Sequence, residues 1–166
     1  EAIIKSQIPI GSGLGSSGAS AAATAVAISH MLGLKLPKKE LIEIAACGEI
    51  ATAGAPHADN VAPSICGGFV IIRSYDPLDI VTFPPPEKLE FALAVPKGMK
   101  KTTRKARSVL PRSIPLIKAV NNIGAASLVV AGLLLSDPYL VGYGMMGDQI
   151  VEPARAFLYP GYLDAK

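Results

Sequence analysis

The spacing of hydrophobic and polar residues predicts strands and helices in the first part of the chain. Residues 1–8, "EAIIKSQI", predict a short strand, which leads into a glycine-rich loop. A helix is expected from Ser16 or Ser17, because serine is a good helix N-cap and no helix breaker follows before Gly33. Helical periodicity returns between residues 37 and 52, so a second helix is expected there.

The middle of the chain predicts a β-hairpin followed by a boundary between two domains. Residues 54–68 contain many turn residues and predict a long loop, whereas residues 69–75 and 79–83 are β-branched or aromatic and predict two paired strands. Pro84–Pro86 cannot continue a strand ladder and stiffens the connection. We therefore expect two partial domains, residues 1–83 and residues 87–166.

Beyond the proline triplet the pattern becomes mainly helical. It predicts a strand over residues 88–96, a short helix over 102–110, a long buried helix over 113–135 and a helical or irregular segment over 148–158. The longest apolar run, Ile123–Leu135, is shorter than the roughly 20 residues that a bilayer requires. No membrane partner is therefore expected.

Composition narrows the class of protein. The 166 residues are 50% hydrophobic, which is enough for a substantial core. The net charge is +3 and the basic residues form no long arm, so no nucleic-acid partner is expected. Cys47 and Cys66 form neither a CxxC pair nor a disulfide-dense pattern, and no leader is visible, which favours the cytoplasm. Both ends read as cut, so we expect an internal fragment.

The loop "PIGSGLGSSGA", residues 9–19, is compatible with three kinds of phosphate-binding loop. Residues 13–18 fit the dinucleotide fingerprint GxGxxG, but a polar lead-in and a downstream helix disagree with it. A P-loop would need lysine where Ala19 stands. A glycine-serine loop that opens directly onto a helix needs no lysine, because backbone amides and the helix dipole hold the phosphates. A plain tight turn with a helix cap is disfavoured by the alternating glycines and the two serines at the helix start.

Three stretches carry a resemblance to a known family. "PIGSGLGSSGASAA" resembles the second signature motif of the GHMP small-molecule kinases, while "HADNVAPSICGG" and "IVEPARAFLYPGY" resemble the homoserine kinases within that superfamily. The resemblance spans residues 8–162, the middle of a family member. It implies an α+β GHMP kinase fold: a ribosomal protein S5 domain 2-like half followed by a ferredoxin-like half, both incomplete.

The resemblance implies ATP-dependent phosphorylation of the side-chain hydroxyl of L-homoserine to O-phospho-L-homoserine, a step of threonine biosynthesis. In that interpretation the glycine-serine loop wraps the phosphates of ATP. Gly18 stands where relatives often carry alanine, which should loosen the helix start slightly without removing an amide donor. The ATP-binding residues expected from the motif are Pro9, Ile10, Gly11, Ser12, Gly13, Leu14, Gly15, Ser16, Ser17, Gly18 and Ala19.

Glu49 is a candidate metal ligand. At about 100° per residue it shares one arc of the second predicted helix with Leu41, Ile42 and Ala45. A carboxylate on an apolar face needs a partner, which a structural salt bridge or an amphipathic edge position could also supply. The resemblance favours Mg²⁺, which binds one or two carboxylates together with phosphate oxygens, and implies that Ser17 completes the site.

His57, Asp59 and Asn60 form the polar cluster "HADN". One histidine and one carboxylate are an incomplete ligand set for a metal, and turn chemistry of Asp and Asn is an alternative explanation. The resemblance implies that His57 and Asp59 bind the substrate's polar ends and that Asn60 orients the attacking hydroxyl as a catalytic residue. It leaves open whether Asp59, also a catalytic candidate, acts as a general base.

Arginine can grip the carboxylate of an amino-acid substrate through two parallel hydrogen bonds. Arg155 in "VEPARA" matches a substrate-binding arginine of the family, and Arg107 corresponds to a second one, with Arg104 as the alternative. A solvated basic face is the simpler explanation for the segment that holds Arg104 and Arg107.

Other functions remain as alternatives. A GHMP kinase acting on mevalonate or a sugar is the nearest one, and "HADNVAP" together with "VEPARA" disfavours it. A dinucleotide-binding oxidoreductase would require a parallel sheet around Gly13, and a non-catalytic fragment would follow from the missing ends. A homodimer is the assembly considered.

Overall fold

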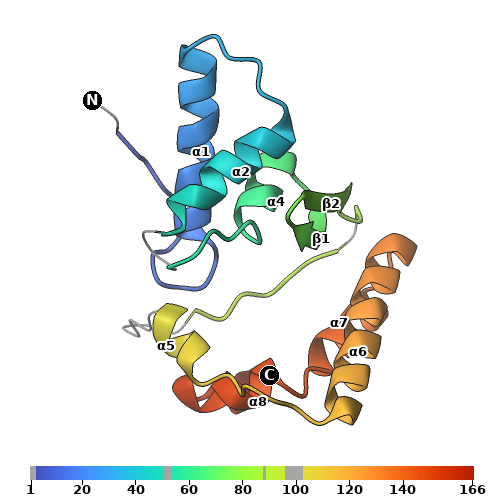
Figure 1. Ribbon diagram of the computed structural model, residues 1–166. Coiled ribbons are helices and arrows are strands. Elements are labelled where there is room, and N and C mark those ends of the chain that lie inside the picture. Colours follow the sequence, from blue (N-terminus) through green and yellow to red (C-terminus); the bar gives the residue numbers. More distant parts are fainter. Residues whose placement is uncertain (1–2, 51–53, 88, 96–102) are drawn as a thin grey trace. The chain divides into compact units, whose positions relative to one another are not determined.

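The structure is a computed structural model that describes residues 3–50, 54–87, 89–95 and 103–166 (Figure 1). It divides into two compact units, Glu1–Pro84 and Pro85–Lys166. The first unit contains α1 (Ser16–Met31), α2 (Lys38–Gly48), α4 (Val61–Cys66), β1 (Phe69–Tyr75) and β2 (Leu78–Phe83). The second contains α5 (Thr103–Ser108), α6 (Leu116–Leu135), α7 (Pro138–Met146), α8 (Val151–Arg155), the 3₁₀ helix η1 (Ala156–Leu158) and α9 (Tyr162–Ala165).

The first two helices lie where the sequence predicts them. α1 begins at Ser16 and ends before Gly33, whose φ of 67° breaks the helix. Pro37 is the extended N-cap of α2, because its fixed φ suits the residue that leads into a helix. α2 ends at Gly48, earlier than predicted, and residues 51–53 of the predicted helix lie outside the described residues.

The prediction of an uninterrupted loop over residues 54–68 is wrong, because α4 forms within it. Val61 and Ala62 are buried there against α1 and α2, and Pro63 falls in the first turn, where a missing N–H leaves no helix hydrogen bond unmade. Burial of this short apolar face therefore outweighs the turn preference of the flanking residues.

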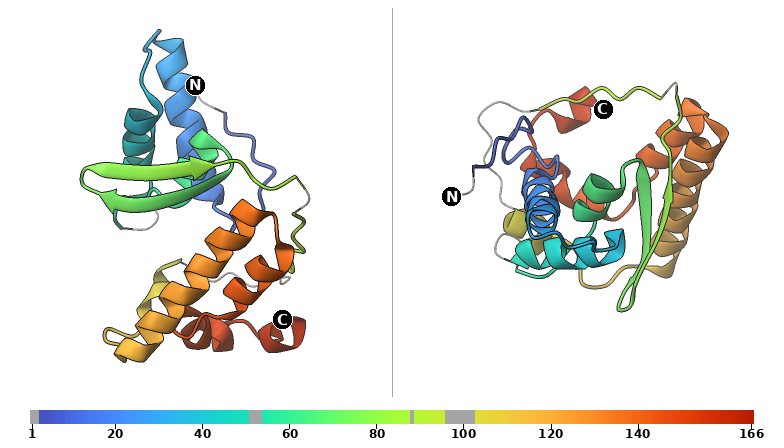
Figure 2. Two further views of the ribbon diagram at one scale, coloured as in Figure 1. Left: turned by 90° about the vertical axis from the view of Figure 1, so that its right-hand side faces the viewer. Right: turned by 90° about the horizontal axis from the view of Figure 1, so that it is seen from above.

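β1 and β2 form the predicted hairpin, and Figure 2 shows the two strands side by side. The pairing is antiparallel and runs from Phe69 opposite Phe83 to Tyr75 opposite Leu78. The rings of Phe69 and Phe83 stack with their centroids 5.8 Å apart, which favours this register.

Two other predicted strands are absent from the described residues. Residues 3–8 and 89–95 have no regular secondary structure, so the predictions over 1–8 and 88–96 are wrong there. A strand is stabilised by hydrogen bonds to a neighbouring strand, and neither described segment pairs with one. The parallel sheet around Gly13 that a dinucleotide-binding fold requires is likewise not formed by the described residues.

The core of the first unit is built from small side chains. Ile42 and Val61 are its largest fully buried residues, and five alanines of α1, α2, α4 and the segment before α4 surround them. Small residues let the helices approach closely: a Cβ added at Gly48 would lie 3.2 Å from the Cβ of Ala21. This close approach brings the end of α2 next to the start of α1, where the glycine-rich loop ends.

α6 and α7 lie side by side in the second unit (Figure 2). Asp137 caps α7 by accepting hydrogen bonds from the amides of Tyr139, at 2.9 Å, and Leu140, at 3.2 Å. α7 was not predicted from the sequence, although an Asp-Pro pair is a typical helix start.

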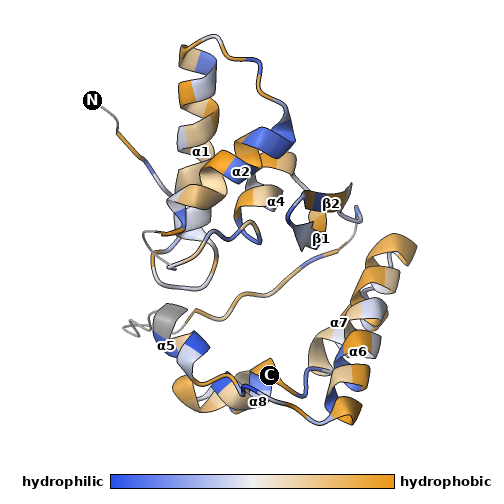
Figure 3. Cartoon of the chain, viewed as in Figure 1, coloured by the Kyte–Doolittle hydropathy of each residue, from blue (hydrophilic) through white to orange (hydrophobic). Residues whose placement is uncertain are grey.

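The long helix α6 is present, but the prediction that it is buried is wrong. Leu116, Ile117 and Ile123 are 80%, 64% and 67% exposed, whereas Leu133 is buried. Figure 3 shows apolar residues along its length. By length and composition alone, α6 could cross a membrane, so the expectation of no membrane partner stays a prediction. Its exposure arises because α7 packs against one side of the helix.

Candidate functional site

The glycine-rich loop adopts a backbone path that other residues rarely follow. Gly11, Gly13 and Gly15 have φ values of 74°, 81° and 74°, in the left-handed region that glycine enters without a steric penalty. The alternation of glycines in the sequence therefore corresponds to alternate left-handed turns of the backbone. Left-handed residues of this kind occur in the anion-binding concavities that successive backbone amides form in other proteins.

The loop ends at the N-terminus of α1. Gly15 is the N-cap residue, and glycine has no side chain with which to cap the first-turn amides. The amides of this turn and the positive end of the helix dipole are suited to hold an anion. Ser16 and Ser17 lie in the same turn and add two hydroxyl groups.

Ser17 and Glu49 meet at this helix start. The Ser17 hydroxyl donates a hydrogen bond of 3.1 Å to Oε2 of Glu49, across 32 residues of sequence. Glu49 follows the last residue of α2 and is only 6% exposed, with the buried residues Ile42 and Ala45 on its side of the helix. The expected place of Glu49 on the apolar side of α2 is confirmed.

The donor chemistry of this pair fits Mg²⁺. Both groups offer hard oxygen atoms, and a buried carboxylate next to a hydroxyl supplies two of the six ligands that octahedral Mg²⁺ requires. Among the described residues no cluster of three or more His, Cys, Asp and Glu side chains could hold a metal by itself. The remaining ligands would have to come from phosphate oxygens and water, as is usual for this ion.

An apolar cavity of about 490 Å³ adjoins the pair. It lies between α1 and α2, and its lining includes Ser17 and Glu49 together with apolar residues such as Ala21, Ile28 and Ile44. The cavity therefore reaches the start of α1, where the glycine-rich loop ends.

Asn60 lies against the end of the loop. A Cβ added at Gly15 would be 2.7 Å from the Asn60 side-chain oxygen, and one added at Gly18 would be 2.7 Å from the Asn60 Cβ. The two glycines thus admit the Asn60 side chain to the start of α1. The sequence offered no signal for this contact, which depends on α4 packing against α1.

The segment before Asn60 is held by a buried alanine. Ala58 is 1% exposed, so it anchors the segment between half-buried His57 and exposed Asp59. The Asp59 carboxylate accepts hydrogen bonds from the Asn60 backbone amide, at 3.0 Å, and from its side-chain nitrogen, at 3.4 Å. This is local turn chemistry of the kind that the sequence left open, and it orients the Asn60 side chain.

The predicted substrate-binding arginines lie in the second unit. Arg155, at the end of α8, donates from Nε to the carbonyl oxygen of Ala106 in α5, at 2.8 Å. This bond brings the Arg155 side chain to the residue that precedes half-buried Arg107. The side chain of Arg104, the alternative to Arg107, lies outside the described residues.

Arg155 also lines a cavity of about 270 Å³ in that unit, together with Asp148, Glu152, Tyr159 and Tyr162. Asp148 was not singled out from the sequence. Its place just before a helical segment is a typical capping signal that could have identified it.

The chain is similar in sequence and structure to known kinases. Residues 1–68 match the model of the GHMP kinases N terminal domain. A homoserine kinase of Chlorobium phaeobacteroides is 49% identical over 98% of this chain and 50% of the relative, and one of Methanococcus maripaludis is 45% identical over 98% and 53%. A crystal structure of homoserine kinase from Cytophaga hutchinsonii has a TM-score of 0.80 and 44% identity, over 97% of this chain and 50% of that one.

The chain thus spans about half the length of the curated relatives it matches. The relationship implied by the three sequence motifs and the expected α+β fold are both confirmed. The division into the two GHMP half-domains and the roles of individual site residues stay predictions.

Proposed function

We propose that this chain, which belongs to the homoserine kinase family of the GHMP kinases, is part of an enzyme that phosphorylates L-homoserine with ATP. The observation that carries the proposal is the convergence of the glycine-rich loop, the Ser17–Glu49 pair and Asn60 at the start of α1. Phosphoryl transfer requires groups that hold phosphates, neutralise charge and aim a hydroxyl, and this arrangement offers each of them.

The loop would hold the β- and γ-phosphates of ATP. Left-handed Gly11, Gly13 and Gly15 let the backbone come close to the phosphates, and the uncapped first turn of α1 supplies amides that are fixed before the substrate arrives. Donors that need no reorganisation during the reaction stabilise the charge that spreads over the transferring group. Residues 9–19 are therefore proposed as the ATP-binding segment.

Glu49 and Ser17 would hold Mg²⁺ between them and the phosphates. When bound, the ion neutralises negative charge on the phosphate oxygens. Burial of Glu49 keeps competing water away from its carboxylate, and the Ser17 hydrogen bond fixes the orientation of Oε2. The chain thus contributes a preformed pair of oxygen ligands.

Asn60 would orient the attacking hydroxyl. Its side chain lies against Gly15, next to the proposed phosphate site, and Asp59 holds its amide nitrogen. The transition state of phosphoryl transfer is loose, so accurate placement of the hydroxyl contributes more than strong proton abstraction. We therefore assign Asn60 a positioning role in catalysis and treat Asp59 and His57 as binders of the substrate's polar groups.

Arg107 and Arg155 would bind the carboxylate of the amino acid. Among the described residues, Arg155 uses Nε for its hydrogen bond to the Ala106 carbonyl oxygen. A guanidinium has further N–H groups, which could bind a carboxylate through two parallel hydrogen bonds. We further propose that the enzyme acts in threonine biosynthesis in the cytoplasm. It would have no nucleic-acid or membrane partner, and it could form a homodimer.

A substrate comparison tests the proposal. The full-length protein is supplied with ATP and Mg²⁺ and with homoserine, mevalonate or galactose, and ADP release is measured together with the phosphorus NMR signal of the product. We expect turnover with homoserine and a phosphate monoester on its side-chain oxygen. Turnover with mevalonate or galactose but not with homoserine would overturn the proposed substrate.

A further inference from the structure

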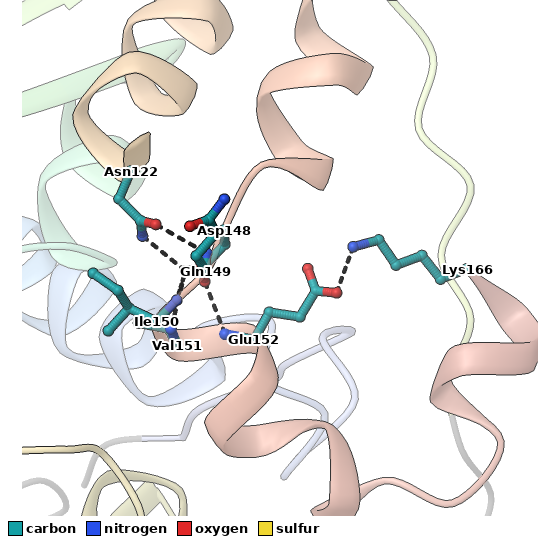
Figure 4. A network of polar contacts seen from close by, with 7 residues as sticks. All are labelled: Asn122, Asp148, Gln149, Ile150, Val151, Glu152 and Lys166. Carbon is teal, nitrogen blue, oxygen red and sulfur yellow. Dashed lines mark hydrogen bonds and ion pairs between the residues drawn. The ribbon is translucent and has the colours of Figure 1, made fainter. Parts of the chain in front are cut away.

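Asp148 accepts an unusually complete set of hydrogen bonds at the start of α8 (Figure 4). Its Oδ1 accepts from the backbone amides of Ile150, at 2.8 Å, and Val151, at 2.9 Å, and its Oδ2 accepts from the amide of Glu152, at 2.9 Å. Three successive amides that would otherwise lack partners are thus bound by one carboxylate.

Asn122 of α6 locks this cap in place. Its side-chain nitrogen donates to Oδ1 of Asp148 at 2.8 Å, and its side-chain oxygen accepts from the backbone amide of Gln149 at 2.9 Å. One asparagine therefore grips two consecutive residues of the segment before α8. The neighbouring Asn121 adds a hydrogen bond of 3.0 Å to the Gln149 side chain.

The charge on Asp148 is well stabilised. Burial would raise the pKa of its carboxyl, but the hydrogen bonds from Asn122 and from the three backbone amides outweigh burial and lower the pKa to about 2. The carboxylate is therefore ionised at neutral pH, as a charge-assisted cap at the positive end of a helix should be.

α8 needs such support because it is short. It consists of Val151–Arg155 and has no buried residue, and a helix of this length is unstable by itself in water. Polar contacts at its two ends and the ion pair of Glu152 with Lys166 add to the packing of its half-buried residues. The N-terminal contact is the Asn122–Asp148 pair, and the C-terminal contact is the hydrogen bond from Arg155 to Ala106.

We infer that Asp148, held by Asn122, is a positioning residue for Arg155 and thereby for the carboxylate of the amino-acid substrate. The inference rests on the proposed function, in which Arg155 binds that carboxylate. Asp148 does not touch the substrate in this account; it fixes the first turn of the helix whose last residue is Arg155. A shift of α8 would move the guanidinium and weaken the carboxylate contact, while the ATP site in the first unit would be unaffected.

The test compares two cap variants in the full-length protein. Asp148→Asn keeps the size of the side chain but turns an accepting oxygen into a donor, and the matched control Asp137→Asn makes the same change at the cap of α7. We expect Asp148→Asn to raise the KM for homoserine about tenfold or more, with the KM for ATP changed less than about twofold. Asp137→Asn should change neither.

A second readout separates positioning from general damage. Binding of 3-aminopropan-1-ol, which is homoserine without its carboxylate, is measured by calorimetry in the presence of ADP and Mg²⁺. Asp148→Asn should weaken binding of homoserine but not of this analogue. Asn122→Ala should act in the same direction with a smaller effect, and it carries the test if Asp148→Asn melts below the assay temperature.

The outcomes distinguish failure of the inference about Asp148 from failure of the proposed kinase function. If the wild-type protein does not phosphorylate homoserine, the proposed function and the inference both fail. If it does, and Arg155→Lys raises the KM for homoserine while neither Asp148→Asn nor Asn122→Ala does, the inference alone is overturned. Equal effects of Asp148→Asn and Asp137→Asn, or equal weakening of homoserine and the analogue, also overturn it.

Discussion

The Ser17 hydroxyl donates a hydrogen bond to the buried Glu49 carboxylate across 32 residues of sequence, at a distance of 3.1 Å. This contact joins the first turn of α1 to the end of α2. Both side chains offer oxygen atoms at the start of α1, and we propose this pair as part of a Mg²⁺–phosphate site.

Glu49→Gln should weaken metal binding while preserving the fold, because glutamine keeps the size of the side chain and an oxygen that can accept from Ser17. We expect the Mg²⁺ concentration for half-maximal activity to rise about 10- to 100-fold. Manganese binding in the presence of a non-hydrolysable ATP analogue, followed by electron paramagnetic resonance, should fall in parallel. Glu43 is an exposed carboxylate of α2, and the control Glu43→Gln should change neither quantity. Unchanged manganese binding in Glu49→Gln would remove Glu49 from the metal site.

Gly15→Ala should impair nucleotide binding beyond its effect on stability. The substitution forces a residue with a Cβ to a φ of 74° and places that Cβ 2.7 Å from the Asn60 side-chain oxygen. Gly33→Ala imposes the same backbone strain at a φ of 67°, in open space. Gly33→Ala should lose about 1–2 kcal/mol of unfolding free energy, and Gly15→Ala should lose at least as much because of the added contact with Asn60. Only Gly15→Ala should weaken ATP binding, by about tenfold or more. Similar ATP affinities in the two variants would contradict the proposed role of the loop.

Asn60→Ala should reduce turnover far more than nucleotide affinity. If Asn60 aims the hydroxyl as proposed, its loss is expected to lower kcat on the order of 100-fold, while the dissociation constant of ATP measured by calorimetry stays within about twofold. Ser64→Ala removes a hydrogen bond of 2.7 Å to the Asn60 carbonyl oxygen without altering the Asn60 side chain, and it controls for loosening of α4. If kcat is the same in Asn60→Ala and the wild type, Asn60 has no part in the mechanism.

The packing of α6 against α7 depends on glycine at one position of α7. A Cβ added at Gly144 would lie 2.6 Å from the carbonyl oxygen of Ala125, so Gly144→Ala should destabilise the protein by about 1–3 kcal/mol in urea unfolding. Gly142 lies in the same helix with nothing within 4 Å of such a Cβ. Gly142→Ala should instead stabilise the protein, by about 0.5–1 kcal/mol. Equal effects of the two substitutions would show that the interface is looser than the structure has it.

Asp148 should make the protein sensitive to acid. Its pKa is lowered from 3.8 to about 2 in the folded protein, so the unfolded state binds the proton more readily. The stabilisation is complete above the unfolded-state pKa and is lost as the pH falls through about 4 toward 2. The difference in urea midpoint between the wild type and Asp148→Asn should therefore shrink between pH 5 and pH 2.5. A difference that stays constant over this range would refute an ionised cap.

Local signals were sufficient where an element depends on its own residues. The start of α1 follows from the serines after Gly15, and the β1–β2 hairpin follows from two β-branched runs joined by a tight turn. The alternation of glycines singled out residues 9–19 as a candidate phosphate loop, and the structure gives Gly11, Gly13 and Gly15 left-handed φ values that few other residues tolerate. Conversely, α4 and α7 were missed although Asn60 and Asp137 stand at their starts, since turn residues and helix caps are the same residue types.

Strands and burial could not be predicted in the same way. Residues 3–8 and 89–95 have apolar residues in plausible strand patterns, yet a strand forms only beside a partner strand. The apolar sequence of α6 predicted burial, but burial depends on what packs around a helix, and Leu116 and Ile117 are exposed. The hydrophobicity of a residue shows that burial would be favourable, but only the elements that pack around it determine whether it is buried.

By itself, the sequence determined the resemblance to the GHMP kinases, the glycine-serine loop motif and the candidate residues, because each depends on a short contiguous stretch. Only the tertiary structure decided which candidates meet. It paired Ser17 with Glu49, placed Asn60 over Gly15, and tied Arg155 through α8 to Asp148 and Asn122. These contacts join residues that are far apart in the chain, and their geometry depends on helix packing that no local pattern encodes.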